Sequence, residues 1–531
     1  GAIVASLTIG TGELIFSTRG GALFGYRILF VFVLISAMKW GLVLATARHM
    51  VLTGVHPYRR MLDLPGPRGW MPLTLLLMCA LCLPVWISFH AGVIGNLTSW
   101  ITGTRDAFHG ATDYLWGAGI LLGVTVLTAS GGYSVLERVQ LVIVATMLLF
   151  STITLILYNP DWLDLLLGLF PQSLTYPDWV PERYPQIAAH SVWVETTRYV
   201  GVIGGAGFDY LAYTSWLREK RWGVLPGVAT EEQLVQMADN PRHPVLQWIR
   251  APFVDATISF VLIIGFSAVF VASGALILSP REIVPDEQNL LNLQAQFVTQ
   301  IHSWLLPLYV SGAFLTMIGT LYGTIEIAVS IADEILRSFV DVWDDRAARK
   351  LKLGVVGWCT LNGLLILGWL FVRQNALPAE HPGGAVVTAS ANVTDASEES
   401  AAPPQQAPRR VGRPRLLLAL VTPANLFTGV LSCGLICCLN LWMDRRWLPS
   451  ALRMPSWLVL LNLVAGLLFL SLGLKGYWDA HDPQGPFFQQ RWFPIIGLMS
   501  AVVGGMVAAW LIASRNGASG RNSDGDSVGP S

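Results

Sequence analysis

Two short glycine clusters, each ending in a carboxylate, are the most unusual chemistry in this chain. Residues 10–13 read GTGE within ASLTIGTGELIFST, and residues 204–209 read GGAGFD within YVGVIGGAGFDYLAYTSW. A glycine inside a helix costs about 1 kcal/mol relative to alanine, and a backbone group freed in hydrocarbon must find a partner within the protein. Two such clusters in apolar surroundings predict two broken helices, whose carbonyls and carboxylates can bind a ligand.

Three further ionisable side chains lie inside apolar stretches, where such groups are costly and face a cavity or a partner. Lys39 occurs in ISAMKWGLV, His90 in WISFHAGVIG and Glu326 in GTIEIAVS. We interpret them as candidates for ion coupling or gating, since Lys39 can neutralise a carboxylate and a histidine can carry a proton. The alternative is structural, because a buried ion pair or a hydrogen-bonded histidine can simply hold helices together.

The composition indicates which elements carry these groups. Of 531 residues, 53% are hydrophobic and 13% charged, and the mean hydropathy is +0.53. This is too apolar for soluble domains, so we expect an all-α, polytopic protein of the lipid bilayer. The 34 basic and 34 acidic residues leave no net charge, which argues against a nucleic-acid partner. No nucleophile-base pair or cofactor motif stands out, so we expect neither an enzyme nor a bound cofactor.

Apolar stretches long enough to cross a bilayer recur along the chain. A transmembrane helix needs about 20 mostly apolar residues, and short polar clusters separate about twelve such stretches. They fall near residues 2–18, 26–50, 70–96, 114–131, 135–158, 191–217, 252–279, 299–335, 351–373, 415–442, 455–474 and 493–513.

The interrupted helices are the first and the sixth, so they hold matching positions in two five-helix repeats. An odd number of helices inverts the second repeat in the membrane, and broken helices at matching positions of inverted repeats form the midplane substrate site of many secondary transporters. Either cluster alone could simply allow close helix packing. The pair, each with an acid, favours a substrate site.

Loop charge predicts the orientation. If the first helix runs outward, the basic stretches RHMVLTGVHPYRR, WLREKRWG and DDRAARKLK fall on one side, while PDWLDLL and SPREIVPDEQ fall on the other. Lys and Arg accumulate in cytoplasmic loops, so we expect both termini in the cytoplasm and the protein in the plasma membrane. RRVGRPR is basic on the predicted outer side, but it follows a long insertion, and long loops carry little weight.

One transmembrane transporter domain is expected over residues 1–513. Residues 375–413, between helices nine and ten, are rich in Ala, Pro and Ser and are expected to form a disordered inserted loop. Residues 514–531 are expected to be a disordered cytoplasmic tail. The sequence gives no indication of oligomeric state.

Several stretches carry a resemblance to a known family. They are GAIVASLTIGTGELIFSTRGGALFGYRILFVFVLISAMKWGLVLATARHMVLTG, YSVLERVQLVIV, NPDWLDLLLGLFPQSL and TPANLFTGVLSCGLICCLNLWMDRRWL. Together they resemble the Nramp family of proton-coupled divalent-metal transporters over most of residues 1–475. The resemblance implies a LeuT-type fold of two inverted five-helix repeats, here with about two extra helices.

The family motifs themselves are altered in the first repeat. The family's Asp-Pro-Gly-Asn motif in helix one falls on residues 10–13, so that Gly10 and Glu13 replace the metal-binding Asp and Asn. The acidic helix-three positions associated with proton movement fall on Phe89 and Gly92, which cannot titrate.

The second motif is altered as well. The family's Met-Pro-His in helix six falls on Ala206, Gly207 and Phe208, which removes the thioether that favours softer transition metals. The remaining oxygen ligands suit hard cations. Lys39 falls where the family usually has a small apolar residue, and an ammonium there could stand in for a carried cation.

We therefore expect a Nramp-like secondary active transporter that moves a cation by alternating access. The expected cation is a divalent metal ion, and a hard ion such as Mg²⁺ or Mn²⁺ is favoured over a soft one. One alternative is a transporter of a small organic solute such as an amino acid or amine, which aromatic residues near the second cluster would suit. Another is a non-transporting sensor or scaffold, and proton coupling stays open.

The predicted substrate-binding residues are Gly10, Thr11, Gly12, Glu13, Gly205, Ala206 and Asp209, of which Glu13 and Asp209 are the metal ligands. The predicted coupling or gating residues are Lys39, His90 and Glu326.

Overall fold

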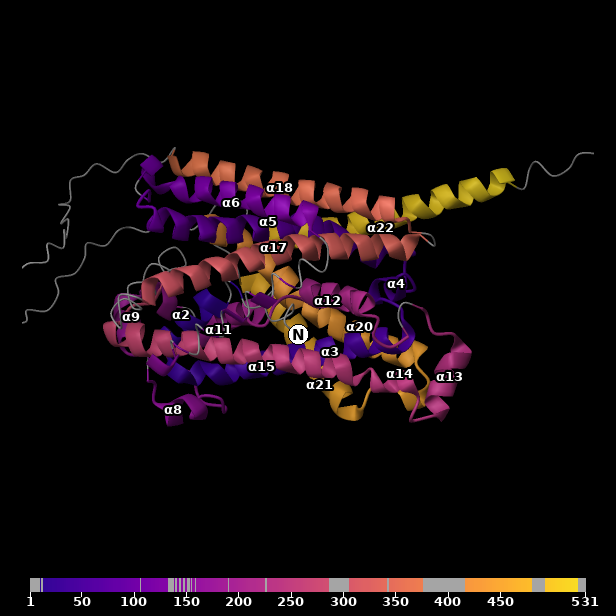
Figure 1. The fold of residues 1–531 in the computed structure, drawn as a ribbon, viewed down its shortest axis with the longest axis horizontal. Helices are drawn as coiled ribbons and strands as arrows, with labels where there is room; N and C mark the ends of the chain where they lie inside the picture. Colours follow the sequence, from indigo (N-terminus) through magenta and orange to yellow (C-terminus); the bar gives the residue numbers. More distant parts are fainter. Residues whose placement is uncertain are drawn as a thin grey trace, which may run out of the picture.

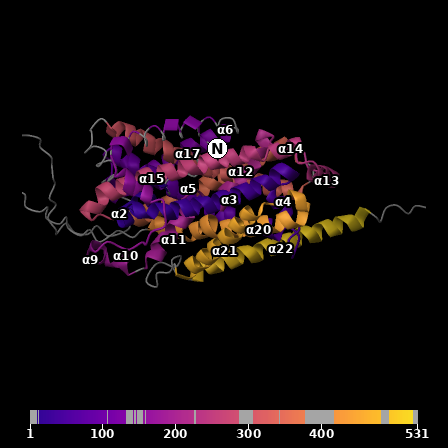
Figure 2. The ribbon, with the colours of Figure 1, turned by 90° about the horizontal axis from the view of Figure 1, so that it is seen from below.

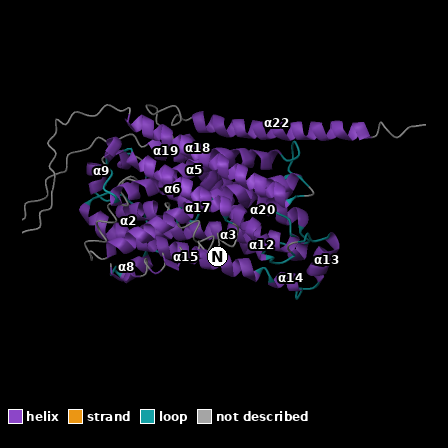
Figure 3. Cartoon of the chain, turned by 45° about the horizontal axis from the view of Figure 1, so that its top comes forward, coloured by secondary structure: helices purple, strands orange, loops and turns teal. Residues whose placement is uncertain are grey.

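The computed structural model describes most of the chain. The described residues are 10, 13–105, 107–131, 159–189, 191–224, 227–285, 305–340, 343–375, 416–479 and 492–523, with scattered positions between 138 and 157. Every regular element in these ranges is a helix (Figure 3). The predicted fifth helix is described only at scattered positions, and the predicted 375–413 loop lies outside the described residues except for residue 375.

Nine helical segments of the described ranges are long and apolar enough to span a membrane. They are Glu13–Thr53, Trp70–Ile101, Thr112–Ser130, Pro244–Arg281, Val310–Phe339, Asp345–Asn375, Leu420–Trp447, Ser456–Trp478 and Trp492–Ser514. The first of them contains the predicted second helix, 26–50, and only the end of the predicted first helix, residues 13–18, because most of residues 2–12 lie outside the described residues. The expected all-α, polytopic membrane architecture is thus confirmed.

The long helices form the body of the molecule, and shorter ones connect them or interrupt them. The long helices are α3 (Leu29–Thr53), α5 (Trp70–Ile101), α6 (Thr112–Ser130), α15 (Arg250–Ser273), α17 (Leu305–Phe339), α18 (Asp345–Asn375), α20 (Ser432–Trp447), α21 (Ser456–Asp479) and α22 (Trp492–Ser523). The short helices are η1 (Glu13–Ser17), α2 (Thr18–Phe24), η2 (Gly25–Ile28), α4 (Pro57–Met61), η3 (Ala107–Gly110), α8 (Trp162–Leu167), α9 (Trp179–Arg183), α10 (Pro185–Ala188), α11 (Val192–Val202), α12 (Gly207–Lys220), α13 (Glu231–Asp239), α14 (Pro244–Gln247), η4 (Gly274–Leu278), η5 (Ser279–Arg281), α19 (Leu416–Asn425), η6 (Leu426–Leu431) and η7 (Ser450–Leu452).

The long helices lie side by side along the longest axis of the molecule (Figure 1). The helix α5 packs on α6, α17, α18 and α22, whereas α3 packs on α15, α20 and α21. The short helices α4, α13 and α14 lie at one end of the bundle, and α9 and α10 lie at the opposite end (Figure 2). The basic HPYRR segment that contains α4 and the acidic NPDWLDLL segment that contains α8 are therefore at opposite ends of the spanning helices.

The last helix is longer than the sequence suggested. The helix α22 continues to Ser523, whereas the predicted tail begins at residue 514. Residues 514–523 contain no proline to end the helix, although Gly517 and Gly520 are poor helix formers. The remaining tail, residues 524–531, lies outside the described residues.

Close helix contacts depend on glycine at several crossings. At Gly274, where η4 crosses α2, a Cβ atom would lie 2.1 Å from the carbonyl oxygen of Thr18. Such a contact leaves no room for a side chain. The crossing holds α2, which follows the first glycine cluster, against the helix that contains α15 and η4.

We predict that Gly274→Ala lowers the free energy of unfolding by about 1–3 kcal/mol, because α2 and η4 must separate to admit the methyl group. Gly265→Ala on α15 is the matched control, since a Cβ there meets nothing within 4 Å. Thermal unfolding of the purified variants in detergent measures the difference. Equal stability of the two variants would contradict a tight crossing at Gly274.

Candidate substrate site between the broken helices

The sixth helix is interrupted at the second glycine cluster. The helix α11 (Val192–Val202) ends and α12 (Gly207–Lys220) begins with residues 203–206 between them, and both lie in the middle of the bundle (Figure 1). Gly204 and Gly205 have φ angles of +80° and +90°, in a region that residues with a Cβ rarely adopt. The glycine pair therefore determines where this helix breaks.

The two clusters share one local structure. In each, a carboxylate in the first turn of the following helix accepts a backbone N–H of the cluster. Asp209 Oδ2 accepts the backbone N–H of Ala206 at 2.6 Å, and Glu13 Oε2 accepts the backbone N–H of Gly10 at 3.0 Å. In both cases the acid lies three residues after the N–H that it binds, as in a capping box. A carboxylate at this position also interacts favourably with the helix dipole.

Glu13 also connects the two clusters to each other. Its second carboxylate oxygen, Oε1, accepts the backbone N–H of Gly204 at 2.9 Å, and its side chain is fully buried. One carboxylate thus joins the first helix to the break in the sixth. Thr11 and Gly12 lie outside the described residues, so their predicted contact with substrate stays a prediction.

Lys39, on α3, reaches the same place from a third helix. Its Nζ donates hydrogen bonds to the carbonyl oxygen of Ile203 at 2.8 Å and to that of Gly205 at 2.6 Å. The side chain is fully buried and interacts electrostatically with Glu13 and Asp209. The structure therefore brings Lys39 together with both predicted metal ligands.

Two further contacts hold the clusters in place. The Tyr210 hydroxyl donates to the carbonyl of Gly204, which lies between the two carbonyls bound by Lys39. Gly10 packs against Thr320 on α17, whose Oγ1 would lie 2.5 Å from a Cβ at Gly10. Gly10 therefore permits close packing, the alternative raised for a single cluster, whereas Gly204 is needed for its backbone conformation.

The other predicted coupling residues have partners elsewhere. Glu326 on α17 forms an ion pair with Lys352 on α18, with Oε1 and Nζ 2.9 Å apart. His90 is buried and stacks on Trp86, with ring centroids 5.5 Å apart. The ion pair of Glu326 connects two helices and matches the structural alternative, whereas the stack of His90 on Trp86 lies within α5. A role of either residue in coupling or gating stays a prediction.

An ion pair lies on either side of the breaks. Toward α9, Arg19 on α2 pairs with Glu195 on α11, with Nε and Oε1 2.5 Å apart. Toward α4, the guanidinium of Arg218 on α12 donates to both carboxylate oxygens of Glu334 on α17. Neither pair could be predicted from the sequence, because the partners lie 176 and 116 residues apart in the chain and belong to no motif.

His56 connects α4 to α12 at the second of these ends. Its Nδ1 accepts the backbone N–H of Tyr58 at 3.2 Å, and its Nε2 lies 3.2 Å from the carbonyl oxygen of Leu211. Burial lowers the pKa of His56, so the ring is neutral at pH 7. A neutral ring protonated on Nε2 satisfies both contacts, accepting from Tyr58 and donating to Leu211.

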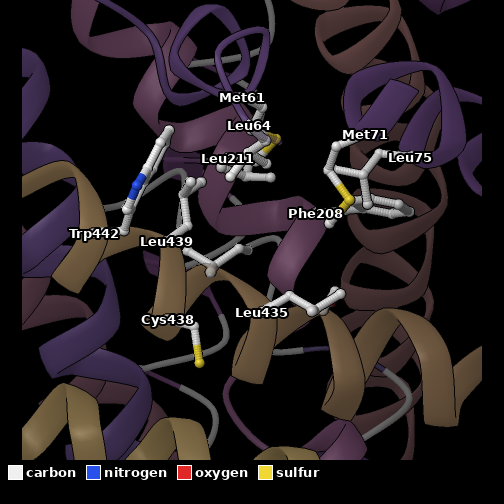
Figure 4. A pocket seen from close by; sticks show the side chains of 12 residues that line it. Met61, Leu64, Met71, Leu75, Phe208, Leu211, Leu435, Cys438, Leu439 and Trp442 are labelled. Carbon is white, nitrogen blue, oxygen red and sulfur yellow. The ribbon is translucent and has the colours of Figure 1, made fainter. Parts of the chain in front are cut away.

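A cavity of about 260 Å³ lies beside α12 (Figure 4). Phe208 and Leu211 line it from α12, Met71 and Leu75 line it from α5, and Trp442 lines it from α20. These side chains offer apolar surface and no charged group. The cavity therefore suits an apolar body better than an ion.

A family model described as natural resistance-associated macrophage protein-like, Nramp, matches residues 1–323 of the chain. The chain belongs to the Nramp family. The matched residues include both glycine clusters and Lys39, so this membership covers the region between the broken helices. None of the curated proteins compared with the chain matches it significantly.

Solved structures show the fold. A manganese transporter of Eremococcus coleocola, in complex with an aromatic bis-isothiourea substituted compound, is 13% identical, with 97% of this chain and 94% of that chain covered and a TM-score of 0.63. A mutant of the same transporter gives a TM-score of 0.65 at 13% identity and the same coverage. The LeuT-type fold of two inverted five-helix repeats expected from the sequence is confirmed.

The possible metal ligands around the breaks differ from the Asp, Asn and Met that the family resemblance implies. The described residues contain no group of three or more His, Cys, Asp or Glu side chains that could hold a metal ion. Among the residues that the structure describes here, the oxygen ligands are the carboxylates of Glu13 and Asp209 and the carbonyls of Ile203 and Gly205. Ala206, where the resemblance places the family's methionine, has only a methyl group, and its N–H is bound by Asp209.

We predict that Gly204→Ala lowers the free energy of unfolding by about 1–2 kcal/mol, because alanine must then adopt the left-handed φ of +80°. The added methyl group itself fits, since its nearest neighbours would be Phe260 at 3.4 Å and Lys39 at 3.6 Å. Gly119→Ala on α6, with open space around its Cβ, controls for the composition change. A Gly204→Ala protein that unfolds at the wild-type temperature would contradict the strained break.

Proposed function

We propose that this Nramp protein is a secondary active transporter that binds a cation midway across the membrane, between the breaks of the first and sixth helices. The single observation that carries the proposal is the Glu13 carboxylate, which binds the N–H groups of Gly10 and Gly204 and so spans both breaks. Broken helices at matching positions of inverted repeats are the usual substrate site of this fold. Family membership and the fold support the same assignment.

The oxygen donors favour a hard cation. Glu13 supplies a carboxylate, and Ile203 and Gly205 supply carbonyls that meet at one point. Mg²⁺ and Mn²⁺ accept such ligands, whereas softer metals prefer sulfur and imidazole. We therefore propose a divalent metal ion of the hard class as substrate, in line with the manganese transporters that share the fold.

The two ion pairs beside the site suit alternating access. Arg19 and Glu195 connect α2 to α11 on one side, and Arg218 and Glu334 connect α12 to α17 on the other. Both pairs are formed at once, so the breaks are enclosed from both ends by charged contacts. We propose that one pair separates while the other holds, which opens the site to each side in turn.

Orientation follows from the loops at the two ends. The end that carries α4, α13 and α14 is the basic one, and by the charge rule it faces the cytoplasm. The same rule places both termini inside, in a plasma-membrane protein. Coupling to protons is part of the proposal, with His90 and Glu326 as the candidates named from the sequence.

We predict that Glu13→Gln abolishes cation uptake while the protein still folds. The amide replaces one acceptor oxygen by a donor that faces a backbone N–H, and it removes the negative charge that attracts the cation. Uptake of Mn²⁺ and Mg²⁺ into proteoliposomes with an imposed pH gradient measures the effect. Glu232→Gln, on the exposed face of α13, should transport like the wild type. Unchanged uptake kinetics in Glu13→Gln would remove Glu13 from the site.

The second candidate function is transport of a small organic solute. The apolar cavity of about 260 Å³ lined by Phe208 and Leu211 favours it, because it lies beside the break and can hold an organic body. Thermal unfolding with added Mn²⁺, Mg²⁺, amino acids or amines separates the two functions, since a ligand of the folded state raises the melting temperature. We expect Glu13-dependent stabilisation by a metal ion, whereas stabilisation by an amine or amino acid alone would favour the organic solute. Absence of flux for every solute would instead indicate a sensor or scaffold.

A further inference from the structure

The carbonyls of Ile203 and Gly205 form a cation-binding arrangement. Neighbouring carbonyls of a regular helix bond to backbone N–H groups along its axis, but φ angles of +80° and +90° at Gly204 and Gly205 release these two. Both now point at a single nitrogen, Lys39 Nζ, at 2.8 and 2.6 Å. Backbone carbonyls that converge on one point are the ligands that proteins use to replace the hydration shell of a cation.

The charges around this point require a cation to be present. The carboxylate of Glu13 is fully buried, that of Asp209 is half-buried, and both interact electrostatically with Lys39. Without a positive charge, the Glu13 carboxylate and the carbonyls of Ile203 and Gly205 would lack a cationic partner, and an unpaired buried charge costs several kcal/mol. The ammonium of Lys39 supplies that charge in the substrate-free protein.

The path of the Lys39 side chain is consistent with this role. It enters from α3 and passes the break at Gly204, where its Cδ would lie 3.6 Å from a Cβ atom. The length of the side chain thus lets Nζ reach the carbonyls of Ile203 and Gly205 while the backbone of Lys39 remains in α3. A flexible four-carbon stem can also withdraw Nζ without unfolding any helix.

We propose that the Lys39 ammonium occupies the cation position of the transport site, so that a divalent cation binds there only when Lys39 leaves the carbonyls of Ile203 and Gly205. This inference rests on the proposed substrate site between the two breaks. An incoming divalent ion would otherwise share two carbonyls with an ammonium, and like charges at such distances in a buried site repel strongly. Lys39 is therefore an internal competitor of the substrate, and its release accompanies cation binding.

A purely structural role for Lys39 makes a different prediction. If Lys39 only ties α3 to the break, then removing its charge weakens the fold and leaves metal affinity unchanged. If it occupies the cation position, removing its charge creates a vacant site that a metal ion can fill. Metal binding to the purified protein therefore separates the two roles.

The test compares Mn²⁺ binding to wild-type protein and to Lys39→Met, measured by the Mn²⁺ paramagnetic resonance signal in detergent. We expect the affinity of Lys39→Met to exceed that of the wild type by tenfold or more, and Glu13→Gln in the same background to abolish the gain. Lys352→Met is the matched control, because Lys352 likewise donates to a backbone carbonyl, that of Gly131, and its charge faces a carboxylate, that of Glu326, but away from the breaks. It should leave Mn²⁺ affinity unchanged.

Unchanged affinity in Lys39→Met, or a gain that persists with Glu13→Gln, would overturn the proposal. If Lys39→Met is too unstable for titration, Lys39→Gln is unfolded thermally with and without Mn²⁺. The proposal requires Mn²⁺ to raise the melting temperature of Lys39→Gln more than that of the wild type, and an equal rise would overturn it.

The two proposals fail separately. Uptake of Mn²⁺ by the wild type, together with unaltered affinity in the Lys39 variants, would keep the transport function and remove the competitor role of Lys39. Increased Mn²⁺ affinity in Lys39→Met without any uptake by the wild type would keep the competitor role and remove the transport function.

Discussion

The arrangement at the centre of this protein depends on one buried carboxylate. Glu13 binds the backbone N–H of Gly10 through one oxygen and that of Gly204 through the other. The break in the sixth helix and the start of η1 leave several backbone groups without helical partners, and in a membrane protein those groups must be satisfied internally. Because Glu13 binds both segments, neither the start of η1 nor the break at Gly204 can shift without breaking one of these hydrogen bonds.

The remaining polar groups of the breaks follow from the same constraint. The carbonyl of Gly204 is bound by Tyr210, the carbonyls beside it are bound by Lys39, and the N–H of Ala206 is bound by Asp209. Each of these side chains comes from a helix that must stay in register with the break, so α3 and α12 are placed by polar contacts as well as by packing. In the described part of the chain these contacts form one polar network within an apolar bundle. A ligand of the Ile203 and Gly205 carbonyls must compete with the hydrogen bonds that Lys39 donates to them.

The sequence predicted the architecture well because the relevant signals are local. Apolar stretches of sufficient length indicate membrane helices, and glycine pairs within them indicate breaks, so α11 and α12 could be separated without a structure. The three-residue spacing of Gly10 to Glu13 and of Ala206 to Asp209 is also local, and it is the spacing of a helix cap. What the sequence could not supply is long-range: Lys39 meets carbonyls 164 and 166 residues away, and backbone carbonyls carry no residue signature. Glu326 illustrates the same limit, since the partner that neutralises it, Lys352, lies on another helix.

The departures from the family motifs are physically linked rather than independent. The resemblance places a proline of the family at Gly207, and here a Cβ atom at Gly207 would lie 2.3 Å from Ser432 Oγ. The absence of a side chain therefore lets α12 lie directly against η6 and α20, where a proline ring would not fit. This close approach keeps α12, and with it Asp209 and Tyr210, in the positions that the break requires. The proposed cation site at the carbonyls of Ile203 and Gly205 would need such rigid placement more than a site of methionine and histidine, because a carbonyl can be aimed only by moving its backbone, whereas a side chain can adjust its own rotamer.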